Sequence, residues 1–136
     1  MNLRLSLGIA ALSMSAAHCG PAAPPAYSEV QAIYTTSCAI GRNCHGIIGA
    51  PPVLMAGMSH AATVNVNATQ ITMPLITPGN LNNSYLWHKI NGTMSTLPQC
   101  SMSNCGTRMP MVGGAALSDA QLDTIRRWIL AGAPSQ

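Results

Sequence analysis

Apolar side chains at helical spacing define a first segment near the start of the folded region. Val30, Ile33 and Tyr34 fall on one face of a 3.6-residue period. The residues Ser28–Gln31, which overlap the start of this pattern, have the form of a capping box, and a capping box marks the beginning of a helix. The pattern predicts a helix over about residues 29–37.

The clearest helical pattern in the chain lies close to its C-terminus. Ser118 and Gln121 form a second capping box. Gly132, followed by Pro134, provides a stop signal. The apolar residues between these signals share one helical face: Leu122, Ile125, Trp128 and Ile129.

The middle of the chain carries weaker signals. A short helix is predicted over Leu54–Thr63, and a β-leaning polar segment over Val64–Ile76. A third helix follows, which Asn82 or Asn83 begins and Gly92 ends. With the two terminal helices, the pattern predicts an all-α domain of three to four short helices joined by long irregular loops.

Two long stretches lack periodicity. Ile40–Gly49 is rich in glycine, and Pro51–Pro52 prevents a helix directly after it. The segment 93–117 is longer than unstructured loops usually are in compact domains. A disulfide between Cys100 and Cys105 would tie this second stretch and contribute about 2 kcal/mol in the chain-entropy model.

The N-terminal segment is typical of an exported protein. Residues 1–18 combine an arginine, an apolar run and small residues before a cleavage position, as in a signal peptide. The apolar run is shorter than the ~20 residues that a membrane-spanning helix needs. Cys19 stands where bacterial lipoproteins carry their lipid; the alternative is plain cleavage after Ala17, which would leave Cys19 as a spare thiol. The Pro- and Ala-rich residues 19–26 resemble a tether. We therefore expect a folded domain over residues 27–136, in the periplasm or cell envelope and anchored to a membrane.

Composition limits both the core and the chemistry. The chain has no Phe, two Trp, three Tyr and 7% charged residues. A net charge of +3 without a basic run is no signature of nucleic-acid binding. The only acidic residues, Glu29, Asp119 and Asp123, leave little for carboxylate catalysis, and no small-molecule substrate is indicated. Either aliphatic side chains or a bound apolar group must supply the burial that aromatic residues usually provide.

Cys38, Cys44 and His45 carry the most informative spacing, C-x5-C-H. A C-x2-C-H motif attaches haem through two thioether bonds, and its histidine ligates the iron. The wider spacing here leaves Cys44 in the standard position and requires Cys38 to reach the second vinyl group. Met109, between an arginine and a proline, offers a soft thioether ligand for the opposite face of the iron.

These features resemble the class I c-type cytochrome family, and more closely the monohaem domains of bacterial exported lipoproteins. The resemblance implies a small all-α fold around one covalent haem c, with the first and last helices crossing. It also implies that His45 and Met109 ligate the iron, that Cys38 and Cys44 hold the ring, and that the protein is an electron carrier for redox partners rather than an enzyme. The segments that carry the resemblance are Tyr27–Tyr34, Cys38, Cys44–His45, Thr77–Gly79, Ser84–Ile90, Arg108–Pro110, Leu117–Ser118 and Ile125–Pro134.

Other interpretations of the same residues remain open. Cys38 and Cys44 could form a disulfide in a haem-free, disulfide-stapled lipoprotein that acts as a structural or interaction module. The four cysteines 38, 44, 100 and 105 could bind zinc, although the first spacing is wide for zinc. In a third interpretation, the protein is a cytochrome-like enzyme in which Met109 dissociates from the iron and the iron binds a small molecule.

Several further residues have plain structural interpretations. Met111 is the fallback for the methionine ligand. His60, His88 and Trp128 are expected to be packing residues, although an indole N–H can also donate to a haem propionate. Arg126 and Arg127 are expected to be solvated charges near a helix C-terminus, where they favour the helix dipole.

Overall fold

The computed structural model describes residues 22–41, 44–100, 105–111 and 115–136, and it shows an all-α protein. Within these residues there is no β-strand, only three isolated bridges. The predicted signal peptide and Cys19 lie outside the described residues. The helices are α1 (Tyr27–Ile33), the π-helical turn η1 (Tyr34–Cys38), α2 (Ser59–Thr63), α3 (Tyr85–Asn91), the 3-10 turns η2 (Met94–Thr96) and η3 (Pro98–Cys100), and α4 (Asp119–Leu130).

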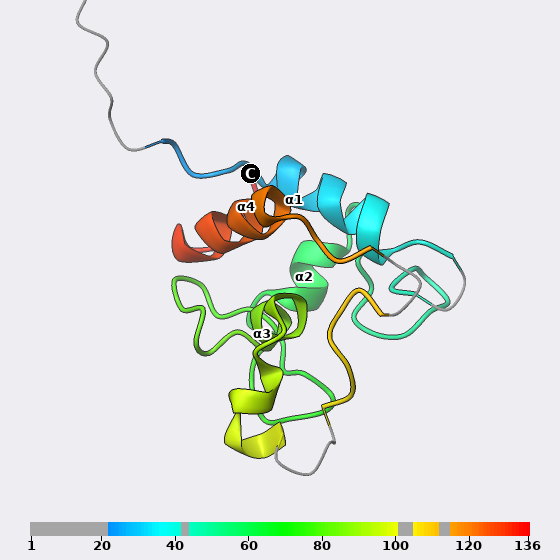
Figure 1. Cartoon of the computed structure of the whole chain (residues 1–136). Helices are drawn as coiled ribbons and strands as arrows, with labels where there is room; N and C mark the ends of the chain where they lie inside the picture. Colours follow the sequence, from blue (N-terminus) through cyan, green and yellow to red (C-terminus); the bar gives the residue numbers. More distant parts are fainter. Residues whose placement is uncertain (1–21, 42–43, 101–104, 112–114) are drawn as a thin grey trace, which may run out of the picture.

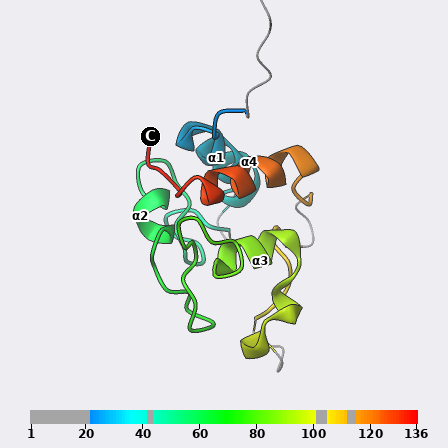
Figure 2. The ribbon, with the colours of Figure 1, turned by 90° about the vertical axis from the view of Figure 1, so that its left-hand side faces the viewer.

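The first and last helices pack against each other, as the sequence predicted. Figures 1 and 2 show α4 crossing α1, with α2 and α3 below them. The ring centroids of Tyr27 and Trp128 lie 5.5 Å apart across this contact. Most residues that the apolar patterns selected are buried here: Val30, Ile33, Tyr34, Ile125, Trp128 and Ile129. Leu122, the remaining one, is partly buried against the same core.

The two predicted capping boxes have different outcomes. At α4 the box is present, because Ser118 Oγ accepts from the Gln121 N–H and Gln121 Oε1 accepts from the Ser118 N–H. At α1 the predicted box is wrong, because the helix begins two residues earlier, after Ala26, and has no side-chain cap. Tyr27 packs on Trp128 and its hydroxyl is hydrogen-bonded to Ser59, so tertiary contacts draw Ser28 into the first turn.

The middle of the chain is less regular than its pattern indicated. Only Ser59–Thr63 of the expected helix over 54–63 is helical, and the β-leaning segment forms bridges in place of a strand. Helix α3 follows Ser84, whose Oγ accepts from the Thr77 N–H at 2.9 Å, so neither Asn82 nor Asn83 is its cap. Gly92 ends α3 with a φ of 80°, as predicted.

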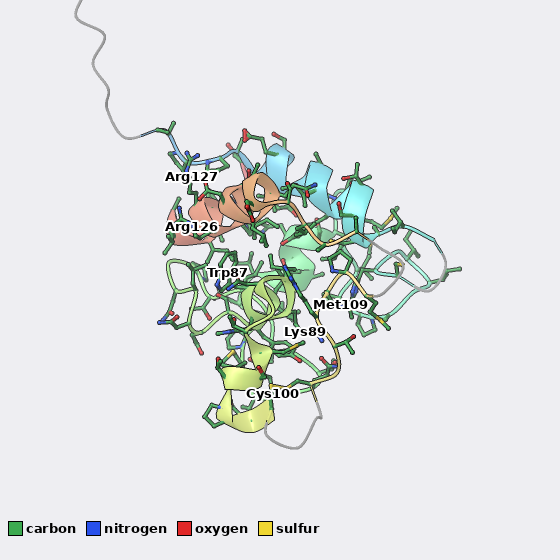
Figure 3. The ribbon with its side chains drawn as sticks, viewed as in Figure 1. Trp87, Lys89, Cys100, Met109, Arg126 and Arg127 are labelled. Carbon is green, nitrogen blue, oxygen red and sulfur yellow. A yellow bond between two sulfur atoms is a disulfide. The ribbon has the colours of Figure 1, made fainter. Side chains whose placement is uncertain are left out.

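The disulfide between Cys100 and Cys105 is present and closes the irregular segment after α3. At the other end of the chain, the guanidinium of Arg127 on α4 donates to the carbonyls of Ala22 and Ala23 in the predicted tether. Figure 3 shows Arg126 and Arg127 on one side of the molecule and Met109 on the other. No helix in the described part of the chain is both long and apolar enough to cross a membrane.

Candidate functional site

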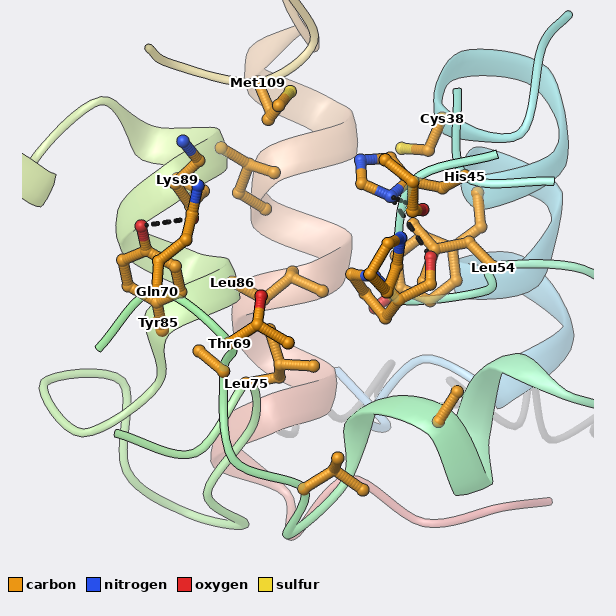
Figure 4. A pocket seen from close by; sticks show the side chains of 18 of the residues that line it. Cys38, His45, Leu54, Thr69, Gln70, Leu75, Tyr85, Leu86, Lys89 and Met109 are labelled. Atoms are coloured by element: carbon orange, nitrogen blue, oxygen red, sulfur yellow. Dashed lines mark hydrogen bonds between the residues drawn. The ribbon is translucent and has the colours of Figure 1, made fainter. Parts of the chain in front are cut away.

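A cavity of about 370 Å³ lies between η1, α3 and the loops that carry His45 and Met109. This volume is within the ~300–1,000 Å³ of typical ligand pockets. Aliphatic side chains form much of the wall, with Leu54, Leu75, Leu86 and Ile90 among them. Figure 4 shows Cys38 and His45 on one side of the cavity, Gln70, Tyr85 and Lys89 on the other, and Met109 at a third edge. The structure therefore brings three of the four predicted site residues to one apolar space.

The imidazole of His45 is oriented by backbone carbonyls. Its Nδ1 lies 3.0 Å from the carbonyl oxygen of Ala50 and 3.1 Å from that of Pro52. Since carbonyls only accept hydrogen bonds, Nδ1 must carry the proton in the neutral ring, and Nε2 keeps its lone pair. Within the described residues Nε2 has no hydrogen-bond partner, and His45 lines the cavity. A carbonyl on one nitrogen and a free lone pair on the other is the usual arrangement of a metal-ligating histidine.

The two cysteines of the C-x5-C-H segment are free thiols. Cys38 ends η1 and lines the cavity, whereas Cys44 is half-buried and does not line it. Burial, together with the nearby Cys44 thiol, raises the pKa of Cys38 from 9.0 to about 11. The Cys38 thiol is therefore protonated at neutral pH and is a poor nucleophile.

Met109 is fixed against α3 by its own loop. The Met109 N–H donates to the Lys89 carbonyl at 2.9 Å, and the Arg108 Nε donates to the Ile90 carbonyl at 3.0 Å. The Lys89 Nζ donates in turn to the carbonyl of Thr107. These three bonds place the Met109 side chain at the cavity edge (Figure 4). The fallback ligand Met111 is 58% exposed and does not line the cavity.

The remaining histidines and Trp128 have structural partners, as expected. His60 Nε2 lies 2.9 Å from the Ala133 carbonyl oxygen, and the His60 ring packs edge-on against Tyr27. His88 is buried between Thr93 and the Asn82 carbonyl. Trp128 Nε1 donates to the Pro134 carbonyl at 2.8 Å, so its N–H is already used in the core.

Tyr34 contributes a polar atom that sequence reasoning assigned only to the core. The side chain is buried and lines the cavity, and its hydroxyl has no hydrogen-bond partner within the described residues. Burial raises the pKa of Tyr34 well above its usual value, with smaller contributions from Cys38 and Tyr27. The hydroxyl therefore stays protonated, and a polar occupant of the cavity would satisfy it.

Sequence reasoning also missed Lys89 and Arg108. Lys89 is 7% exposed and lines the cavity, and burial lowers the pKa of its ammonium below the usual value. The signal was present in the sequence, because Lys89 stands three residues after Leu86 and one before Ile90, on the inward face of α3. Arg108 had no such signal, since its contact with α3 depends on the path of the loop.

The four-cysteine zinc hypothesis is wrong. Cys100 and Cys105 are bonded to each other and cannot serve as thiolate ligands. In the described part of the chain, no group of three or more His, Cys, Asp and Glu side chains gathers as a metal site would require.

Comparison of the chain with protein-family models, curated proteins and solved structures gave no significant match.

Proposed function

We propose that the protein is a monohaem c-type electron carrier, with His45 and Met109 as the axial ligands of the iron. The observation that carries the proposal is the convergence of an oriented imidazole and a thioether on one apolar cavity. Histidine nitrogen and methionine sulfur are the ligand pair of electron-transfer cytochromes c, in which methionine raises the potential.

The residues around the cavity fit a haem. Aliphatic walls suit the apolar faces of the ring, and the orphan Tyr34 hydroxyl can donate to a polar group of an occupant. Cys38 lines the same space, Cys44 directly precedes His45, and both are free thiols, as thioether bonds to a haem would require. In the alternative interpretation, a haem-free module with two disulfides, Cys38 and Cys44 would be bonded to each other, whereas both are free thiols in the structure.

Each residue has a limited task in this function. His45, held through Nδ1, presents Nε2 without rotating, and the bonds between the Met109 loop and α3 hold the sulfur in place. The leucines and Ile90 line the cavity with apolar surface that would cover the faces of the ring. When bound, haem iron supplies a reversible one-electron couple, and two protein ligands leave it no open position for a substrate.

The proposal extends to location and partners. An exported chain with a lipid on Cys19 would hold the domain at a membrane of the cell envelope and exchange electrons with redox proteins there. Neither nucleic acid nor a small-molecule substrate is part of this proposal.

Expression in a host with a c-type maturation system tests the proposal. We expect a band on a denaturing gel that stains for haem, and a low-spin visible spectrum that carbon monoxide leaves unchanged in the reduced protein. His45→Ala should abolish the low-spin spectrum, whereas His60→Ala, a matched change outside the cavity, should keep it. A wild-type chain without haem, with a mass that shows two disulfides, would contradict the proposal and favour the haem-free module.

A further inference from the structure

Lys89 is a buried cation without a counter-charge. It is the only lysine of the chain, it is 7% exposed, and its Nζ donates to the carbonyls of Cys105 and Thr107. No acidic side chain forms an ion pair with it in the described residues, where the single ion pair joins Arg126 to Asp123. A buried charge that lacks a partner of opposite sign is costly, so an anion is expected beside it.

The donors at this end of the cavity are incompletely used. An ammonium has three N–H donors, and the two carbonyls account for two of them. The Gln70 Oε1 accepts from the Tyr85 hydroxyl at 2.8 Å, and the Nε2 of this exposed residue keeps two N–H donors without a partner in the described chain. Figure 4 shows Lys89, Gln70 and Tyr85 together on the side of the cavity away from His45.

The two nitrogens face a space that a side chain would otherwise fill. A Cβ on Gly106 would lie 3.7 Å from Lys89 Nζ and 3.8 Å from Gln70 Nε2. Gly106 has a φ of +65°, a conformation that also favours glycine. An ammonium and an amide that converge on one open space match the two oxygens of a carboxylate.

We propose that Lys89, Gln70 and the space at Gly106 form a carboxylate-binding site at the end of the cavity opposite His45. This inference rests on the proposed function, since in the haem-loaded protein the carboxylate is a propionate of the haem. The site would fix which edge of the ring faces α3. The propionate would in turn balance the charge of Lys89, which none of the three acidic residues of the chain pairs with in the described structure.

Zero-length coupling of the haem-loaded protein with a water-soluble carbodiimide tests the site. The carbodiimide adds to a carboxylate and forms an O-acylisourea. The Lys89 amine then attacks the acyl carbon, an amide bond forms, and the former carbodiimide leaves as a urea. Because Lys89 is the only lysine, mass spectrometry of peptic fragments should find the Lys89 fragment joined to the haem. Haem-bearing protein in which Lys89 stays uncoupled, or is coupled to Glu29, Asp119 or Asp123, would overturn the inference.

Two variants supply a second readout. Lys89→Arg keeps the charge but forms no amide, so it should lose the coupling and keep the midpoint potential. Lys89→Met removes the charge and should lower the reduction equilibrium constant at least tenfold, a shift of about 59 mV for one electron. A Lys89→Met protein with bound haem and the wild-type potential would also overturn the inference. A chain without haem would contradict the proposed function instead, and the visible spectrum of the same sample separates the two failures.

Discussion

At the scale of single residues, the protein's chemistry depends on small backbone details. Two carbonyls fix the proton of His45 on Nδ1, and one N–H donated to Lys89 holds the Met109 loop on α3. The sequence named His45 and Met109 because their neighbours have a known pattern, Cys44 before the one and Pro110 after the other. It gave no sign of the unpaired Tyr34 hydroxyl, which appears only when the core is assembled. The position of Lys89 on the inner face of α3 could be read from its spacing to Leu86 and Ile90, but its lack of a counter-charge could not.

Replacement of Met109 tests the sulfur ligand. Met109→Ala should retain covalent haem but lose the sulfur-to-iron charge-transfer band of the oxidised protein, since the exposed Met111 is outside the cavity wall. Met111→Ala is the matched control and should keep the band. Survival of the band in Met109→Ala would assign the ligand to another residue.

Single serine variants of the two free cysteines test haem attachment. Cys38→Ser and Cys44→Ser should each keep covalent haem with a pyridine haemochrome spectrum shifted toward that of a ring with one free vinyl group. The double variant should lose haem on a denaturing gel. An unshifted spectrum for Cys38→Ser would show that only Cys44 is attached, in spite of the position of Cys38 in the cavity wall.

At the scale of elements, periodicity was most informative where a helix meets another helix. The apolar faces of α1 and α4 were predictable, and so was the cap of α4, because both are local patterns confirmed by packing. The first residues of α1 and α3 were not, because Tyr27 and Ser84 are positioned by contacts with distant segments. The Met109 loop had no pattern, and its path depends on bonds to α3.

The C-terminal end of α3 offers a test of this dependence. Gly92 has a φ of 80°, and a Cβ there would lie 3.1 Å from Arg108 Cδ in the Met109 loop. Gly92→Ala should therefore cost more than the ~1 kcal/mol expected from the backbone conformation alone. It should also weaken the methionine charge-transfer band, because Arg108 holds the loop.

Gly57→Ala is the matched control in chemical denaturation. Gly57 has a φ of 79°, but a Cβ there meets no atom within 4 Å. Gly57→Ala should therefore lose only the part of the unfolding free energy that comes from the backbone conformation, and it should leave the visible spectrum unchanged. Equal losses of unfolding free energy for the two variants would show that the Arg108 side chain moves away from the added Cβ without loss of stability.

At the scale of the whole molecule, the lack of phenylalanine and the cavity belong together. The described core is built mainly of aliphatic side chains around Tyr34, Tyr85 and Trp128, and it leaves about 370 Å³ beside them. A haem in this cavity would bury the aliphatic wall, and each Å² of apolar surface removed from water stabilises the fold by about 25 cal/mol. Small domains have ~5–15 kcal/mol in total, so the occupant is expected to be part of the fold.

Removal of the haem should therefore unfold much of the chain. We expect the protein expressed without the maturation system to show weak helical circular dichroism and a broad urea transition. The haem-loaded protein should show strong helical circular dichroism and a cooperative urea transition. A haem-free chain that unfolds as cooperatively and at the same urea concentration would show that the cavity needs no occupant.

The contact between Arg127 and the N-terminal segment bears on how far the domain can move from a membrane. Arg127 binds the carbonyls of Ala22 and Ala23, on the side of the molecule away from Met109. With a lipid on Cys19, about four residues separate the lipid from that contact, and at ~3.5 Å per residue they span at most on the order of 14 Å. The domain would then rest close to the lipid headgroups, with α4 toward the bilayer and the cavity turned to the aqueous phase. An electron partner would have to approach from that phase and could not slide between domain and membrane.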